Sequence, residues 1–200
     1  MRRLCACVLL LLACIQVKSQ NGAIKINATQ LNQELIHTLF LQLLNHHRDS
    51  LHLATLSVNG VLNLAAQCQG NYMASNALLT HSQPDKTKAT PSKRVELFNG
   101  SFATIGENCL FVPLAAPFKI KTKTFTIITY NDLAYAMFLS WKYSAPHYKN
   151  MINKDFTLSG FNISYSAKNN SVFAAQVFAG KEYVAPKKFP RKRIFNYTNN

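Results

Sequence analysis

Three side chains in this sequence could share one polar site: His81, Glu107 and His147. Histidine and carboxylate pairs are the usual components of acid–base sites and of zinc sites. A carboxylate beside an imidazole orients the tautomer of the ring and stabilises its cation. We therefore expect His81 and Glu107 to meet across a cleft, although 26 residues separate them. With His147 they would supply three of the three or four ligands that zinc prefers.

Hydrolytic chemistry has little other support in the sequence. There is no Gly-x-Ser-x-Gly elbow, no His-Glu-x-x-His and no phosphate-binding glycine loop. Ser144 lies three residues before His147 but has neither an elbow nor an evident oxyanion hole, so we assign no catalytic residue. The enzymatic alternative is a weak or metal-assisted hydrolase in which His81 and Glu107 form the acid–base pair.

The first 19 residues have the pattern of a secretory signal. Arg2 and Arg3 precede an apolar run from Leu4 to Ile15, which is short for a membrane span. We expect export to the extracellular space or the periplasm, with lipid anchoring at Cys14 as the alternative. We then expect a leader over residues 20–30, one domain over 31–180 and a basic tail over 181–200.

The chain is strongly basic, with a formal net charge of +14 at pH 7. Such a charge favours acidic partners such as anionic lipid, glycan or nucleic acid, although many soluble proteins are basic without such a partner. The cations of the tail that could bind an anionic surface are Lys187, Lys188, Arg191, Lys192 and Arg193. A surface adhesin that uses this tail is therefore a further hypothesis, beside the simpler reading of a solvated tail.

Cys68 and Cys109 are the cysteines that remain after the signal. In an oxidising compartment such a pair is compatible with a disulfide. Closing a loop of about 41 residues would add roughly 4 kcal/mol of stability in the chain-entropy model. Both cysteines also lie in apolar patterns, which are typical of buried free thiols, and the sequence leaves both alternatives open.

The apolar spacing predicts helices first and strands later. Leucines four residues apart predict a helix over residues 29–47, and Asn59 can cap a second helix that continues to about residue 76. Residues 82–92 are polar and read as a loop, residues 109–112 as a strand, and residues 114–124 as a connection or edge strand. A third helix begins at Thr129 or Asn131 and ends at Pro146, and two strands cover residues 161–165 and 172–178. This order favours an α+β domain with helices packed on an antiparallel sheet.

Six fragments in a fixed order resemble the CAP superfamily, also called the SCP domain, in its secreted bacterial form. They are Met73 with His81; Thr90, Pro91, Arg94 and Val95; Gly106-Glu107-Asn108; Trp141, Ser144, His147, Asn150, Met151 and Ile152; Asp155-Phe156-Thr157 with Gly160; and Gln176-Val177-Phe178. The resemblance covers about residues 31–179. It implies an α-β-α sandwich with a central antiparallel sheet flanked by helices.

The resemblance also implies a cleft around His81, Glu107, His147 and Ser144. Many relatives have two histidines and two glutamates in a cleft that can hold a divalent metal such as zinc. Phe173 stands where many carry the second histidine, and Ser144 where many carry the second glutamate. The resemblance implies lipid, sterol, glycan or peptide ligands, and we expect a secreted, non-enzymatic binding protein. Trp141 is expected in the core, and Arg94 is expected to be structural and to pair with a carboxylate.

Overall fold

The computed structural model describes residues 21–181. The predicted signal, the lipid-anchor alternative at Cys14 and the basic tail from residue 182 onward lie outside the described residues, and these assignments stay predictions. Among the helices of residues 21–181, none is long and apolar enough to cross a bilayer.

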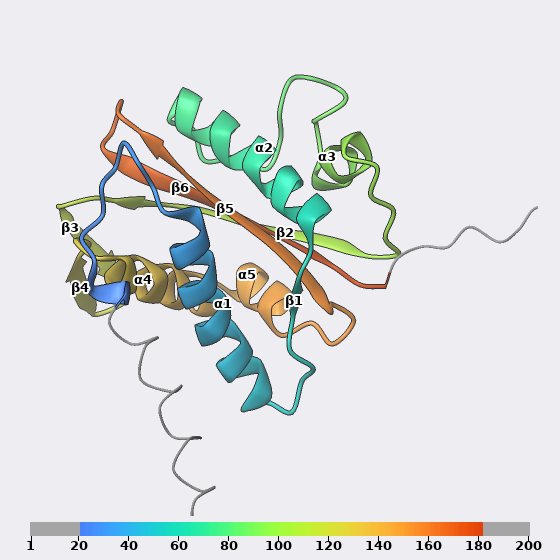
Figure 1. The fold of residues 1–200 in the computed structure, drawn as a ribbon, viewed down its shortest axis with the longest axis horizontal. Helices are drawn as coiled ribbons and strands as arrows, with labels where there is room; N and C mark the ends of the chain where they lie inside the picture. The colour runs from blue at the N-terminus through green and yellow to red at the C-terminus, as the bar shows by residue number, and fades with distance from the viewer. Residues whose placement is uncertain (1–20, 182–200) are drawn as a thin grey trace, which may run out of the picture.

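Five α-helices and six strands follow a short 3-10 helix (Figure 1). Their bounds are η1 Asn21–Ala23, α1 Gln33–Asp49, β1 Ser57–Val58, α2 Gly60–Asn76, α3 Pro91–Leu97, β2 Ile105–Pro113, β3 Pro117–Ile120, β4 Lys123–Thr126, α4 Tyr130–Lys142, α5 Ala145–Met151, β5 Leu158–Ser166 and β6 Ser171–Ala179.

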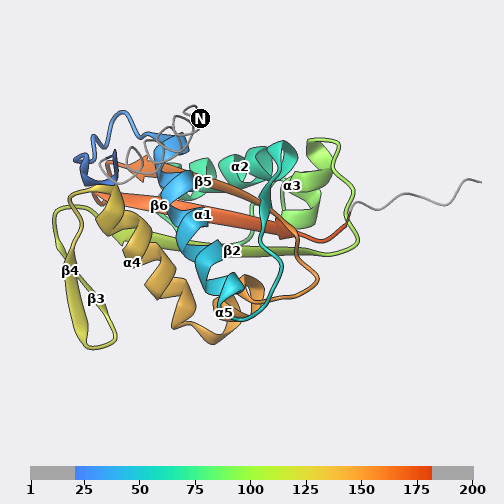
Figure 2. The same ribbon diagram turned by 60° about the horizontal axis from the view of Figure 1, so that its bottom comes forward.

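The main sheet has the strand order β1-β5-β6-β2, and helices cover both of its faces (Figures 1 and 2). Helices α2 and α3 pack on one face, while α1, α4 and α5 pack on the other. The predicted α+β class and α-β-α sandwich are confirmed. The sheet is mixed rather than fully antiparallel, because the two residues of β1 pair with β5 in parallel whereas β2, β6 and β5 pair antiparallel.

The larger core lies between the sheet and the α1–α4 pair. Phe40 of α1 stacks on Phe161 of β5 at 5.0 Å between ring centroids and meets the edge of Trp141 at 5.1 Å. Trp141 is fully buried, as the sequence predicted. Since stacked and edge-to-face rings add to the energy of burial, this aromatic group fixes how α1 and α4 sit on the sheet.

Helix ends follow the capping chemistry of the sequence. Asn59 caps α2 through a hydrogen bond from the backbone N–H of Leu62, as predicted. Helix α1 begins later than residue 29, because Asn32 and not Thr29 accepts the capping bond. Both asparagines are strong N-caps, since the side-chain oxygen satisfies a backbone N–H that the helix leaves free.

Two prolines begin helices that the sequence prediction missed. Residues 82–92 were predicted as a loop, but their last residues begin α3. Thr90 caps this helix, and Pro91 is its first residue. Pro146 does not end the third helix: α4 stops at Lys142, and Pro146 lies in the first turn of α5. Proline fits a first helical turn because no intrahelical bond is required of its nitrogen there. Residues 117–126, predicted as a connection or edge strand, form a separate β3–β4 hairpin.

Side chains rather than a strand cover the free edge of β5. Beyond the short β1, the amide of Gln33 donates to the Ile163 carbonyl at 2.6 Å and accepts from its N–H at 3.1 Å. Asn63 accepts from the N–H of Phe161 at 3.0 Å. These carboxamides satisfy backbone groups that an exposed edge would offer to another chain, which is how many proteins avoid edge-to-edge association.

Helix α2 lies so close to β5 at Gly160 that a substitution there should be costly. A Cβ added at Gly160 would collide with the backbone of Leu62 and Asn63, whereas a Cβ at Gly60 would meet nothing within 4 Å. We expect Gly160→Ala to lower the free energy of unfolding by about 1–3 kcal/mol or more, because α2 must move away from the sheet. Gly60→Ala should change it by less than about 1 kcal/mol. Urea denaturation of both variants makes the comparison, and equal effects would contradict this packing.

Candidate functional site

A buried ion pair lies at the centre of the candidate site. Arg94 of α3 and Glu107 of β2 have side chains that are 0% and 1% exposed, and Nη2 of Arg94 donates to Oε2 of Glu107 at 2.6 Å. The same guanidinium donates to the carbonyls of Lys88 at 2.7 Å and His81 at 3.2 Å. The expected pairing of Arg94 with a carboxylate is confirmed. The pair holds α3 and the loop that precedes it against the sheet.

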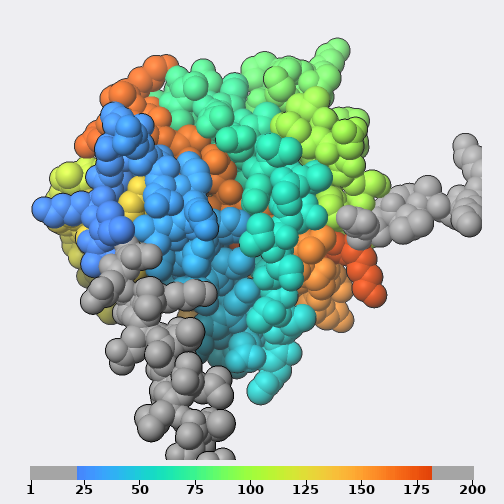
Figure 3. Space-filling model, in the orientation of Figure 1, coloured from blue at the N-terminus to red at the C-terminus, as the bar shows by residue number. Residues whose placement is uncertain are grey.

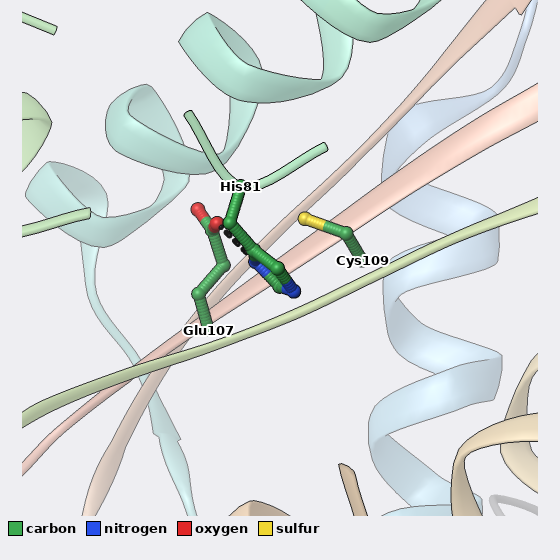
Figure 4. Close-up of side chains that lie close together, drawn as sticks. All are labelled: His81, Glu107 and Cys109. Carbon is green, nitrogen blue, oxygen red and sulfur yellow. Dashed lines mark hydrogen bonds and ion pairs between the residues drawn. The ribbon is translucent and has the colours of Figure 1, made fainter. Parts of the chain in front are cut away.

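His81 completes the arrangement from the loop after α2 (Figure 4). Its Nδ1 lies 2.9 Å from Oε1 of Glu107, and its side chain is 51% exposed. Because a carboxylate oxygen can only accept, Nδ1 carries the hydrogen and Nε2 of a neutral ring keeps its lone pair. No residue within 21–181 hydrogen-bonds to Nε2. The carboxylate thus orients a half-exposed imidazole whose second nitrogen can meet a ligand.

Buried amides hold the loop that carries His81. Gln69 of α2 is fully buried, and its side-chain nitrogen donates to the carbonyl of Thr80. Gln83 donates to Oε1 of Gln69 at 3.0 Å. The residues on both sides of His81 are therefore tied to α2, while Arg94 binds the carbonyl of His81 itself. These contacts position the histidine even though it lies in an irregular segment.

The Gly-Glu-Asn sequence links the two helical layers across β2. Successive side chains of a strand point to opposite faces, so Glu107 faces α3 while Asn108 faces α5. Asn108 donates to the carbonyl of His147 at 3.1 Å and accepts from Asn150 at 2.8 Å. A side chain at Gly106 would collide with the ring of Phe156. Glycine therefore leaves room for the side chains of α5 and the following loop to lie close to the strand.

His147 is tied to β2 through the hydrogen bond that Asn108 donates to its carbonyl. It belongs to α5 and is partly buried. Burial lowers the pKa of His147, and the nearby charge of His81 lowers this pKa further. Both effects disfavour a second positive charge, so a neutral His147 suits metal ligation or hydrogen bonding.

Ser144 occupies the N-cap position of α5, but its side chain makes no capping hydrogen bond. Among the hydrogen bonds of residues 21–181, none joins its hydroxyl to His147. The structure thus gives this serine no activating base.

A cysteine, which the sequence reading assigned to no ligand set, lies beside the pair. Donor atoms of His81, Glu107 and Cys109 all lie within 4.8 Å of one another (Figure 4), and His147 is not part of this group. Burial and the neighbouring Glu107 raise the pKa of the Cys109 thiol well above its ordinary value. The strand was predicted only over residues 109–112, whereas β2 begins at Ile105. Had it been extended to Glu107, the spacing of two residues would have put Cys109 on the same face as Glu107.

The disulfide alternative does not hold in this structure, because Cys68 and Cys109 are both free thiols. Cys68 lies on α2 with its sulfur 3.7 Å from the side-chain nitrogen of Gln83. Cys109 lies on β2 and packs with the smaller core under α2. The two sulfurs therefore have different neighbours, and the structure has the alternative of free thiols, with Cys109 buried and Cys68 partly buried.

His81, Glu107 and Cys109 together could offer a divalent metal one nitrogen, one oxygen and one sulfur ligand. Imidazole, carboxylate and thiolate are all zinc ligands, but Oε2 of Glu107 is already held by Arg94 and the thiol of Cys109 resists deprotonation. Phe173, at the position of the second histidine of many relatives, packs on Phe111 at 5.7 Å between ring centroids. Only a loose three-donor site is present among the described residues.

The sequence and the fold match a known family. Residues 41–178 fit the model of the cysteine-rich secretory protein family, CAP, and the chain belongs to this family. It is a CAP/SCP-domain protein, as the six fragments suggested. No curated protein matches the sequence closely enough to be reported as a relative.

Three bacterial structures show the same fold. An outer surface protein of Borrelia burgdorferi is 19% identical with a TM-score of 0.54, and the match covers 80% of this chain and 99% of that one. The CAP domain of enterococcal PrgA is 14% identical with a TM-score of 0.56, covering 86% and 73%. An extracellular SCP-domain protein of Bacillus anthracis is 21% identical with a TM-score of 0.53, covering 72% of this chain and 40% of that one. At these identities the likeness establishes the fold alone.

Removing the buried cation should be far more costly than removing an exposed neighbour. We expect Arg94→Met to lower the free energy of unfolding by about 3–5 kcal/mol, because it leaves Glu107 buried without its partner. Lys93→Met is the matched control: Lys93 pairs with exposed Glu96, and its loss should cost less than about 1 kcal/mol. Chemical denaturation measures both, and adding Glu107→Gln to Arg94→Met should recover part of the loss. Similar small effects of the two single changes would show that the buried pair is not a main support of the fold.

Proposed function

We propose that the protein is an exported, non-enzymatic CAP domain that binds a ligand at a polar site centred on His81. The observation that carries this proposal is the geometry of His81 and Glu107. Glu107 is buried and paired with Arg94, and it orients the half-exposed imidazole of His81. Such preorganisation reduces the cost of fixing the recognising side chain on binding. Ser144 and His147, which we also predicted for the cleft, would line the side of the site next to α5.

The non-enzymatic reading rests on the nucleophiles near the pair. The thiol of Cys109 has a raised pKa and is buried, which is opposite to the environment of a reactive cysteine. Ser144 has no base within the described hydrogen bonds. His81 and Glu107, 2.9 Å apart, do have the geometry of an acid–base pair, so a weak or metal-assisted hydrolase is the competing function.

A divalent metal such as zinc is one class of ligand that the donors fit. His81, Glu107 and Cys109 would hold it, with His147 as the further donor that we predicted from the sequence. A bound metal would supply a Lewis acid to which an oxygen or nitrogen of an organic ligand can add. Lipid, sterol, glycan and peptide ligands remain the organic candidates.

We place the protein outside the cytoplasm, in the extracellular space or periplasm. The signal-like residues 1–19 support this location, with attachment through Cys14 as the alternative. Two relatives by fold are described as an outer surface protein and an extracellular protein, which agrees with it. Adhesion to anionic polymers through the tail is a separate hypothesis, and deletion of residues 181–200 would remove that binding without removing the His81 site.

Zinc binding tests the proposed site directly. Calorimetric titration of the protein with zinc should give binding that falls at least about tenfold in His81→Ala, because one of three donors is lost. His52→Ala, which removes an exposed histidine outside the site, should bind like the wild type. Cys109→Ala then tells whether the thiol takes part.

Three outcomes are informative. Zinc binding that persists in His81→Ala would remove His81 from the metal site. If zinc does not bind at all, the wild type, His81→Ala and His52→Ala are compared for copurified or added lipid, sterol, glycan or peptide. The wider proposal is wrong if His81→Ala alters the binding of none of these. Ester or peptide turnover that disappears in both His81→Ala and Glu107→Gln would favour the hydrolase instead.

A further inference from the structure

A groove between two helices lies away from His81. It has a volume of about 820 Å³ and lies between α1 and α2, with Phe161 and Asn162 of β5 at its base. Figure 3 shows atoms of the sheet between the blue α1 and the teal α2. The groove is at the β1–β5 side of the sheet, whereas Glu107 lies on β2 at the opposite edge. It is therefore a second site, independent of the function proposed above.

The walls of the groove are partly apolar and almost uncharged. Val58 and Leu64, which line it, leave 52% and 44% of their surfaces exposed. Glu34 is the one residue with a formal charge at pH 7 among the lining residues, in a chain whose net charge is +14. Because lysine and arginine are missing from this lining, the groove favours a neutral or cationic ligand over an anionic one.

The polar groups of the groove match those of a peptide backbone. The side-chain amides of Gln42 and Gln67 line the groove and make no hydrogen bond within residues 21–181. The side chain of Asn63 also lines it, and only its oxygen makes a hydrogen bond among these residues. Each carboxamide offers both donors and an acceptor, as a peptide group does. His37 also lines the groove, and its Nε2 is buried without a partner among the described residues. Buried polar groups of native proteins are usually hydrogen-bonded, so this nitrogen is available to a group bound in the groove.

The aromatic residue of the groove does not offer a free face. Phe161 is only 5% exposed, since Phe40 and His37 stack on it. A sugar ring would therefore find no flat aromatic surface, while aliphatic walls with interspersed amides suit the side chains and backbone of an extended peptide.

We infer that this groove binds a basic peptide segment, and that the segment is the tail of the same chain, residues 182–200. Ala179 at the end of β6 pairs with Leu158 of β5, and Leu158 pairs with Ser57 of β1. Since neighbouring strands lie about 4.8 Å apart, the end of β6 is roughly 10 Å from β1, which contributes Val58 to the groove. The 19 residues of the tail could span about 60 Å, so they reach the whole groove.

Charge and apolar content agree with this occupant. The tail carries five lysines and arginines against the single acid Glu182, and its Phe189, Phe195 and Tyr197 could cover Val58 and Leu64. Its cations complement Glu34 at the rim. A segment tethered so near has a millimolar effective concentration, so a weak site is sufficient to hold it. A foreign peptide would have to compete with this concentration.

Photo-crosslinking in the full chain tests the inference. Benzoylphenylalanine is placed at position 189 or 195 in separate proteins, and crosslinked peptides are mapped by mass spectrometry in the monomer fraction. We expect crosslinks from at least one position to residues 33–45 or 58–67. Glu34→Lys should lower their yield about three- to tenfold, because it replaces the attraction of the tail by repulsion. Asp49→Lys makes the same change of charge at the other, exposed end of α1 and should leave the yield unchanged.

Several results would overturn the inference. Crosslinks that fall outside the two groove segments, or that are missing from both positions, would show that the tail does not occupy the groove. Crosslinks between two molecules that increase with protein concentration would make a second copy the partner. Equal yields in Glu34→Lys and Asp49→Lys would remove the charge argument.

Discussion

The buried ion pair between Arg94 and Glu107 is the interaction on which the site depends. Neither charge is accessible to water, so the cost of desolvation is offset only by their mutual contact and by the further hydrogen bonds of the guanidinium. Those bonds go to the carbonyls of Lys88 and His81. One arginine therefore fixes the helix on which it lies, the loop before it and the carboxylate that orients His81.

The edge strand β2 connects the helices on the two faces of the sheet. Glu107 faces α3 and Asn108 faces α5, since neighbouring side chains of a strand point to opposite sides. Asn108 and Asn150 hold the helix that carries His147. The two histidines are thus held by neighbouring residues of one strand, from segments that pack on opposite faces. A site at this edge stays open to solvent although its supporting charges are buried.

Much of this arrangement could be predicted from local sequence chemistry. Leucine spacing and the asparagine cap at Asn59 gave the first two helices, and the order of the motifs led to the sandwich and to the meeting of His81 with Glu107. Pro146 was misread because a proline that follows a helical pattern can end one helix or begin the next, and only the position of α4 decides. The thiol of Cys109 was considered for a disulfide, although its place two residues after Glu107 put it on the same face. The groove between α1 and α2 depends on how two helices on opposite faces of the sheet are placed relative to one another, and no local pattern encodes that placement.

The tautomer of His81 tests the central claim most directly. Long-range nitrogen–proton NMR correlation on histidine-labelled protein reports which ring nitrogen carries the hydrogen, at a pH where the ring is neutral. If the buried pair orients this side chain, His81 is held as the Nδ1–H tautomer, with Nε2 unprotonated and facing the ligand. A predominant Nε2–H tautomer, or rapid averaging like that of exposed His52, would show that Glu107 does not position the histidine.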